Sequence, residues 1–419
     1  MSRGFRYDAV VIGAGSAGLV AATRLAQAGA SVAVLAKGVG CTHLAAGTVD
    51  VLGYAPELVS RPLEAVAALT HENPQHPYAR IGQQRIGEAL RWLQATLDAG
   101  PLAPYTYVGD ADHNGLHPTA LGALRPSALV PSTMAAGERT QLERVCIVGT
   151  PALRDFHPSL CAANLSRAGV QARAVSVELE LERADMSTLG IARRLEEPRW
   201  RAEFCARLTP LLRSEERVGL PAMLGLREPH TVHADLEHRL GRRVFEIPSL
   251  PPSVAGMRLY ESLRAALRAA GGRLMLGAEV VSHTREDGRL SAVQTGAAGH
   301  AASYSADAFV LASGGFASGA IELDSHWATH ERVLGLALDG VPAPGEPRFL
   351  PDYQAAQPLA SVGVAVDAQL RALGASNVYV AGASLPGAVP WREASGEGIA
   401  VASGFAVAQT ITGGRERHG

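Results

Sequence analysis

The stretch "VIGAGSAGLVAATRLAQAGASVAVLAKG", residues 11–38, decides the fold. It overlaps an apolar, β-branched run at residues 7–12, which predicts a buried strand. An alanine-rich helix is expected at residues 19–28 and a second buried strand at residues 31–35. Strand, glycine-rich turn, helix and strand in this order predict one βαβ unit of an α/β fold.

The glycines between strand and helix have the spacing of a dinucleotide-binding turn. Gly13 permits the tight turn, Gly15 lets the backbone approach a pyrophosphate, and Gly18 lets helix and strand pack closely. Ala14 lies inside the same turn and is expected to contact the cofactor. The phosphates are predicted at the helix N-terminus, where free N–H groups and the helix dipole favour anions. The alternative is a pocket that has lost its ligand in a structural subunit.

Lys37 stands near the position where such pockets usually carry a carboxylate for the ribose hydroxyls. A cation there can hold a phosphate or a ribose oxygen. It can equally cap the strand with its ammonium group in water. Both readings stay open on the sequence, and Lys37 is kept as a predicted cofactor contact.

Length and composition set the broad class of protein. The chain has 419 residues, of which 47% are hydrophobic and 19% charged, and its formal net charge is −2. This length suits two lobes, and the near-neutral charge does not indicate a general nucleic-acid binder. No apolar run approaches the ~20 residues of a membrane helix. The first strand begins within a few residues of Met1, so no secretory leader is expected.

Four cysteines occur, at positions 41, 146, 161 and 205, and none forms a C-x-x-C pair. This pattern excludes an ordinary cysteine-ligated iron–sulfur cluster within the chain. It offers no disulfide framework either, which fits a reducing cytoplasm. His113 and His117 flank Gly115, but their surroundings provide too few further ligands to predict a metal site.

Three features favour a flavin over a nicotinamide cofactor. The glycine motif lies close to residue 1, and a later strand ends in "LASGGF", which contains Gly314. A last strand reaches Gly382 and precedes a helix from about Gly398. That helix can aim its N-terminus at the flavin edge where negative charge gathers on reduction. Because no second G-x-G-x-x-G occurs, a separate NADH-binding domain is not expected.

The chain is therefore predicted to be a Rossmann-like flavin-binding domain of the α/β class with an inserted α/β lobe, which serves as a substrate or cap lobe. Residues 1–60 and 246–419 are expected to build the flavin-binding domain, and residues 61–245 the inserted lobe. Within the lobe we expect a strand at residues 144–149 and one helix at residues 193–213.

Beyond these motifs, the sequence resembles the B-subunit family of the anaerobic glycerol-3-phosphate dehydrogenases. More distantly it resembles the fumarate reductase and aspartate oxidase flavoproteins, whose "LSKG" turn is similar to the "LAKG" at residues 35–38. The resemblance covers nearly the whole chain. The matching stretches are "CTHLAAGTVDVLGY" (41–54), "HPYARIG" (76–82), "TALGALRPSALVPSTM" (119–134), "VCIVGTPALRDFHPSLCAANL" (145–165), "PPSVAGMRLYESL" (251–263) and "FVLASGGFASG" (309–319).

The resemblance implies oxidation of sn-glycerol 3-phosphate to dihydroxyacetone phosphate in anaerobic respiration. Electrons would pass through a flavin and a membrane-bound iron–sulfur subunit to quinone, with a second flavoprotein subunit in the complex. FMN is the cofactor usually attached to this subunit, whereas the glycine motif by itself suggests FAD, so both stay open. A cytoplasmic location is expected, with contact to the inner membrane made through a partner.

Candidate active residues follow from the resemblance and from side-chain chemistry. His43 matches a family position and is predicted as the base or a flavin contact, the alternative being a loop histidine bonded to backbone. Arg125 can clamp a phosphate with its fork of donors, or form a surface ion pair. Gly47 and Thr48 are expected to approach the flavin, with Asp50 orienting their loop.

Two other functions stay open on the sequence. In this family a second flavoprotein subunit can carry the substrate chemistry, which would leave this chain as an electron-transfer or assembly subunit. The chain can also be a fumarate-reductase-like oxidoreductase acting on a small dicarboxylate. That function would require cationic carboxylate clamps, and the abundance of arginine does not exclude it.

Overall fold

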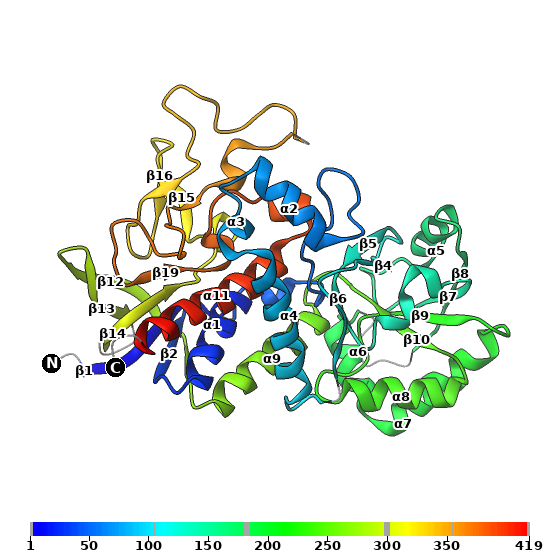
Figure 1. Cartoon of the computed structure of the whole chain (residues 1–419). Coiled ribbons are helices and arrows are strands. Elements are labelled where there is room, and N and C mark those ends of the chain that lie inside the picture. The colour runs from blue at the N-terminus through cyan, green and yellow to red at the C-terminus, as the bar shows by residue number, and fades with distance from the viewer. Residues whose placement is uncertain (1–2, 104, 180–184, 297–301, 354, 417–419) are drawn as a thin grey trace.

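A seven-stranded sheet forms the centre of the fold, in the order β11-β2-β1-β14-β13-β12, with β19 beside β14 (Figure 1). The computed structural model describes residues 3–103, 105–179, 185–296, 302–353 and 355–416. β1 lies between β2 and β14 and is parallel to both. The strands are β1 (Arg3–Ile12), β2 (Val32–Ala36), β11 (Arg273–Leu276), β12 (Glu279–Glu286), β13 (Arg289–Gly296), β14 (Ala302–Leu311) and β19 (Val378–Val380).

Burial explains why these sequences form central strands. All five residues of β2 are buried, and Val10 and Val11 of β1 have no exposed surface. Apolar runs without polar alternation are typical of parallel strands covered on both faces. The prediction of a Rossmann-like α/β fold is confirmed.

Four helices pack together beside the central sheet: α1 against α11 and α9, and α4 also against α11 and α9 (Figure 1). A Cβ atom on Gly404 of α11 would lie 2.4 Å from the carbonyl oxygen of Ala17 on α1. Such an approach requires glycine, so α1 and α11 are in direct backbone contact. The helices are α1 (Ser16–Gln27), α4 (Gln83–Asp98), α9 (Val254–Ala269) and α11 (Gly396–Glu416).

A second sheet of four parallel strands, in the order β10-β9-β7-β8, lies to the right of the central sheet in Figure 1. It has its own apolar core, drawn from residues between 136 and 254. The strands are β7 (Arg144–Gly149), β8 (Gln171–Ser176), β9 (Arg217–Pro221) and β10 (Val244–Ile247). The nearby helices are α5 (Pro158–Arg167), α6 (Thr188–Leu195), α7 (Pro198–Leu208) and α8 (Pro229–Leu240).

The single helix expected at residues 193–213 is wrong. The structure has α6 and α7 there, and Glu197 between them is extended, with φ −80° and ψ 116°. Pro198 follows, and a proline disfavours the helical conformation of the residue before it. The chain therefore breaks and restarts at this point, with Pro198 as the first residue of α7.

The division into a flavin-binding domain and an inserted lobe stays a prediction. The apolar cores around the central sheet and the second sheet show which helices pack with which sheet. Val66 of α2 (Pro62–Glu72) and Leu90 of α4 belong to the core around the central sheet. We propose that residues 61–245 include both the lobe around the second sheet and helices that cover the flavin-binding domain. Two short hairpin-like pairs, β3 (Tyr107–Gly109) with β6 (Leu129–Pro131) and β4 (Gly115–Pro118) with β5 (Leu124–Ser127), lie between these helices and the second sheet in sequence.

A fully buried ion pair joins the two parts. Arg258 on α9 donates from Nη1 to Glu246 Oε2 on β10 at 2.6 Å, and from Nη2 to Glu246 Oε1 at 3.0 Å. Neither side chain has exposed surface. Burial alone would raise the pKa of Glu246, but the charge and hydrogen bonds of Arg258 outweigh it and the net pKa is lowered. Tyr105 and Thr133 complete the network with hydrogen bonds to this pair.

Candidate functional site

A cavity of about 870 Å³ opens at the carboxyl ends of the parallel strands. Ligands bind in this position in open α/β sheets, and the volume is that of a small-molecule or cofactor site. Its wall contains the last residue of β1 and of β2 and the residues that directly follow β14 and β19, namely Ile12, Ala36, Ala312 and Ala381.

The glycine-rich turn forms one wall of this cavity. Gly13 has φ +115°, and a Cβ atom there would lie 2.2 Å from the carbonyl oxygen of Ala312. A Cβ atom on Gly15 would meet nothing within 4 Å. Gly13 therefore lets two strand ends approach each other, while Gly15 leaves open space between the backbone and the cavity.

Two helix N-termini reach the cavity, with Ser16 and Ala17 of α1 and Gly396 and Glu397 of α11 in its wall. The first turn of α1 has no acidic residue, and its N-cap Gly15 makes no side-chain cap. Free amides at the positive end of a helix dipole bind phosphate well. This arrangement favours an anionic ligand at α1.

Lys37 lines the cavity just beyond β2 and pairs with a carboxylate from another strand. Its Nζ lies 3.1 Å from Oε1 of Glu279 on β12, and both side chains are exposed. Glu279 also lines the cavity, so a carboxylate does stand beside the end of β2. It comes from a residue 242 positions later in the chain.

Arg125 on β5 lines the cavity and forms an ion pair with Asp50. The other oxygen of Asp50, Oδ1, accepts a hydrogen bond from Thr48 Oγ1 at 2.9 Å. Asp50 is buried, whereas 44% of the Arg125 side chain is exposed. The guanidinium is thus held from one side by a buried carboxylate and open on the other, which suits a second anion.

His43 does not line the cavity. Its ring stands edge-on against Tyr260 of α9, with the ring centroids 4.6 Å apart, and its Nε2 is buried without a hydrogen-bond partner. Burial lowers the pKa of His43. No histidine is among the described residues that line the cavity. The role of His43 as base or flavin contact stays a prediction, and the ring would have to leave Tyr260 to fulfil it.

The remaining predicted cofactor contacts fall into two groups. Ala14, Thr48, Gly314 and Gly382 line the cavity, as Gly13, Gly15 and Lys37 do. Gly18, Gly47 and Gly398 lie behind its wall, where an added Cβ would come within 2.1 to 2.6 Å of Gly13, Ala255 and Tyr78 respectively. These three glycines permit close packing of the elements that carry the wall.

The sequence reasoning missed Glu279 and Glu397 as cavity residues. Glu279 begins a strand with no motif around it, so its sequence held no signal. Glu397 stands in "SGEG" at the start of the last helix, and a carboxyl in a first helical turn has an ordinary electrostatic explanation. Only the packing of α11 on α1 brings it to the cavity.

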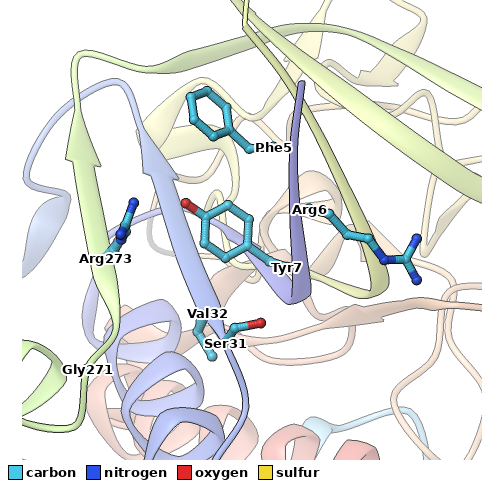
Figure 2. Close-up of a pocket in the computed structure, with 7 residues that line it drawn as sticks. All are labelled: Phe5, Arg6, Tyr7, Ser31, Val32, Gly271 and Arg273. Atoms are coloured by element: carbon cyan, nitrogen blue, oxygen red, sulfur yellow. The ribbon is translucent and has the colours of Figure 1, made fainter. Parts of the chain in front are cut away.

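A smaller hollow of about 370 Å³ lies at the opposite edge of the sheet, beside the amino ends of β1, β2 and β11 (Figure 2). Tyr7 and Arg273 line one side of it, while Arg6 extends to the other side of β1 and pairs with Asp307. Nothing there resembles the glycine turn and helix ends of the large cavity, and we assign it no role.

Metal-binding and membrane-spanning features are both missing from the described ranges. Those residues contain no cluster of three or more histidine, cysteine or acidic side chains placed to hold a metal ion. Across the parts of the chain that the structure describes, no helix combines the length and apolar character needed to span a bilayer.

Comparison with known proteins places this geometry in context. Residues 8–399 match the family described as FAD binding domain. The chain is similar to the B subunit of the anaerobic glycerol-3-phosphate dehydrogenase of Vibrio cholerae, with 29% identity over 97% of this chain and 96% of the relative. The B subunits of the same dehydrogenase from Pectobacterium atrosepticum (31% identity, 97% and 98% covered) and Yersinia enterocolitica (31%, 98% and 99%) are also similar.

Solved structures of oxidoreductases align with the chain at low sequence identity. A quinol fumarate reductase chain of E. coli aligns with a TM-score of 0.48 and 10% identity, over 100% of this chain and 72% of that one. The 3-ketosteroid delta1-dehydrogenase of Sterolibacterium denitrificans aligns with a TM-score of 0.44 and 13% identity, over 98% and 100%.

Proposed function

Because this chain belongs to the FAD binding domain family, and within it to the family of the anaerobic glycerol-3-phosphate dehydrogenase B subunits, we propose that it is the flavin subunit of a glycerol-3-phosphate:quinone oxidoreductase. It oxidises sn-glycerol 3-phosphate to dihydroxyacetone phosphate in anaerobic respiration. The observation that carries the proposal is the large cavity at the carboxyl edge of the sheet, with a glycine turn, two helix ends and a held arginine in its wall.

The residues present fit a flavin nucleotide. The open space at Gly15 and the amides of the first turn of α1 that follow Ser16 suit a pyrophosphate, while the Ser16 amide itself donates to Thr42 Oγ1. Glu279 and Lys37 stand at the end of β2, where a carboxylate accepts from ribose hydroxyls. This supports FAD, since FMN has no adenosine ribose to engage the pair. Bound flavin supplies the acceptor for the two electrons of the substrate.

Arg125 is the proposed binding group for the substrate phosphate. Asp50 fixes the guanidinium from the buried side, so its remaining donors point to a ligand with little loss of side-chain freedom. In this role Asp50 and Thr48 position Arg125 and do not touch the substrate. We keep His43 as the proposed base, reached by movement of its loop.

The chain works within a complex. Its relatives are named as subunits, so partner chains are implied. We propose a second flavoprotein subunit and a membrane-bound iron–sulfur subunit, which accepts the electrons for quinone. The cytoplasmic face of the inner membrane is the proposed location, with attachment through that partner.

The absence of a described histidine from the cavity wall favours a second candidate function. In that case the chain is an electron-transfer or assembly subunit, and the other flavoprotein subunit oxidises the substrate. A third possibility, action on a small dicarboxylate, is tested by the same measurement.

The test is anaerobic addition of substrate to the purified, flavin-loaded chain. Bleaching of the flavin absorbance by glycerol 3-phosphate, and loss of this bleaching in Arg125→Met, is the expected result. The control is Arg144→Met, because Arg144 begins β7 of the second sheet, forms an exposed ion pair with Glu215 and does not line the cavity. Bleaching only after the partner subunits are added would support the second candidate. Bleaching by a dicarboxylate in place of glycerol 3-phosphate would overturn the proposed substrate.

A further inference from the structure

Glu397 is a carboxyl in the cofactor cavity that the proposed reaction leaves without a task. It stands in the first turn of α11 and lines the cavity. Its Oε1 is buried and has no hydrogen-bond partner. An unpaired buried carboxylate oxygen is costly, so its presence in a cavity wall calls for a ligand or a proton.

The Glu397 carboxyl also meets a chain of hydroxyl groups. Ser16, the first residue of α1, hydrogen-bonds the Glu397 carboxyl. The Oγ of Ser16 lies 3.0 Å from Oγ1 of Thr42, which also accepts from the Ser16 amide at 3.1 Å. When Glu397 is ionised, Ser16 donates its single hydroxyl proton to the carboxylate, so Thr42 is then the donor in the bond between the two hydroxyls. Glu397 is the end of this chain, and its Oε1 is the open position.

The other carboxylates of the cavity wall have cationic partners, and Glu397 differs from them. Asp50 pairs with Arg125, and Glu279 pairs with Lys37. Among the residues that the structure describes, no basic side chain pairs with Glu397. It is therefore the cavity acid whose charge is least compensated.

The groups that face Glu397 increase the cost of its charge. The negative charge of Asp50, in the loop after β2, raises the pKa of Glu397. Arg125 on β5 pairs with Asp50 and not with Glu397. Tyr107 of β3 lies close enough for Glu397 to raise its pKa, and Tyr78 of α3 (Pro77–Ile81) packs against the next residue of α11, Gly398. Glu393 of α10 (Pro390–Glu393) is turned away, bonded to His76 and Ser395.

Burial raises the pKa of Glu397 to about 7, the hydrogen bond from Ser16 opposes this rise, and the charge of Asp50 adds to it. At neutral pH the carboxyl is therefore close to its midpoint. A further negative charge in the same enclosed cavity favours the protonated form.

We propose that Glu397 is the proton-exchanging group of the cofactor cavity, taking up a proton when electrons enter the bound flavin and releasing it when they leave. The inference rests on the proposed binding of flavin in this cavity. Oxidation of an alcohol to a ketone releases two electrons and two protons. Glu397 holds one of these protons and the other accompanies the electron pair. When the electrons pass to the redox centre of a partner subunit, Glu397 returns its proton to water, and the proton that accompanied the electron pair is released to water as well.

The experiment is a potentiometric titration of the flavin-loaded chain from pH 5.5 to 8.5, with chemical reductant and mediators in place of substrate. Each proton bound per two electrons adds about 30 mV per pH unit to the slope. Above about pH 7 the slope of the wild-type chain should exceed that of Glu397→Gln by this amount. Below this pH the wild-type chain and Glu397→Gln should have the same slope of flavin potential against pH, because the carboxyl is already protonated before electrons enter.

Two further variants keep the result interpretable. Glu397→Asp retains a titrating group and should keep the steeper slope, whereas Glu393→Gln tests whether any neutralised acid near this helix start has the same effect. Equal slopes for wild type and Glu397→Gln, or an equal loss of slope in Glu393→Gln, would overturn the proposal.

A second readout needs no bound flavin. The infrared band of a protonated carboxyl should titrate near pH 7 in the wild-type apoprotein and be missing from Glu397→Gln. Absence of this band in the wild type also overturns the proposal, even where the flavin potential cannot be measured in a variant. If glycerol 3-phosphate fails to reduce the flavin of the isolated chain but the slopes differ, the proposed substrate oxidation by this chain falls and the role of Glu397 stands.

Discussion

Gly13 and Gly15 are two residues apart and serve different purposes. Gly13 has a positive φ and touches the backbone that follows β14, so the fold itself requires it. Gly15 has φ −75°, which any residue adopts, and only open cavity lies around its missing side chain. The same residue type in one motif therefore has two roles: Gly13 is required by the fold, and Gly15 is proposed to leave room for the pyrophosphate.

Substitution by alanine should separate these two roles. Gly13→Ala should lower the free energy of unfolding of the apoprotein by at least about 1–3 kcal/mol, the usual cost of a strained backbone. Gly15→Ala should leave unfolding almost unchanged and weaken flavin binding tenfold or more. Denaturant melts and flavin fluorescence titrations measure the two effects.

Gly4→Ala is the control for both variants, because Gly4 lies in the same strand, β1, and has nothing within 4 Å of an added Cβ. It should change neither stability nor affinity beyond a few tenths of a kcal/mol. Flavin affinity of Gly15→Ala equal to that of the wild type would contradict the assignment of this turn to the pyrophosphate.

Glu397 should also make the stability of the apoprotein depend on pH. Its pKa in the folded chain is raised from 4.5 to about 7. A carboxyl with a raised folded pKa stabilises the fold at low pH, and this contribution is lost as the pH rises from about 4.5 to about 7. The full difference corresponds to about 3 kcal/mol. Relative to Glu397→Gln, the wild-type chain should therefore lose up to this amount between pH 4.5 and pH 8 in denaturant melts. A pH-independent difference between the two chains would count against a titrating Glu397.

At the scale of elements, one buried ion pair links α9 to β10. The side chains of Arg258 and Glu246 have no exposed surface, and their charges pair with each other. Arg258 also donates to the carbonyl oxygen of Gly225, and Glu246 accepts from the amide of Leu224. The pair ties the second sheet to a helix that packs on α1. Loss of one partner leaves the other charge buried and alone.

Glu246→Gln and Arg258→Met should each cost about 3–5 kcal/mol of unfolding free energy, because an uncompensated buried charge or donor remains. The exposed pair of Arg144 and Glu215 is the matched control, and Arg144→Met should cost less than about 1 kcal/mol. The double variant Arg258→Met/Glu246→Leu should recover part of the loss. If chemical denaturation gives the same loss of unfolding free energy for the buried and the exposed pair, the buried pair does not stabilise the contact between α9 and the second sheet.

Local patterns predicted several elements of the central sheet and the second sheet, and one failure has a physical cause. The apolar run before Gly13 fixes β1, and the turn at Asp287 and Gly288, which both have positive φ, fixes the β12–β13 hairpin from short-range information alone. The sequence predicted one helix through Pro198, because apolar residues recur with helical spacing on both sides of the proline. There the conformational restriction imposed by proline outweighs periodicity.

The sequence patterns could not predict the direction in which the side chain of His43 points. His43 lies in a short 3₁₀ turn, Cys41–Leu44, in which neighbouring residues point to different sides. Thr42 turns to Ser16 and His43 to Tyr260, a residue of a helix more than 200 positions later. The approach of Glu397 to Ser16 is equally non-local, so packing decides which polar groups reach the cavity.

At the scale of the whole molecule, the cavity joins segments from both ends of the sequence. The Lys37–Glu279 pair links the end of β2 to β12 and supplies the carboxylate that the first βαβ unit lacks. In the proposed mode of FAD binding, the ribose end of the site is therefore built partly by the second half of the chain. A motif search confined to the first unit cannot find it.

This pair should distinguish the two flavin nucleotides. Glu279→Gln should weaken FAD binding about tenfold, since a partly exposed charged hydrogen bond contributes about 1.5 kcal/mol. FMN binding should stay the same, because FMN has no adenosine ribose. Asp307→Asn, which breaks the exposed pair with Arg6 at the other edge of the sheet, is the control and should affect neither. Equal weakening of FMN and FAD in calorimetric titrations would contradict this assignment.

The order of strands in the central sheet has a consequence for biosynthesis. β1 leaves the ribosome first, yet one of its two neighbours, β14, begins at Ala302, and the helix that packs on α1 begins at Gly396. A nascent chain must carry an unfinished sheet through most of translation. Loading with the redox cofactor must then be a late event that follows synthesis of α11, which supplies part of the cavity wall.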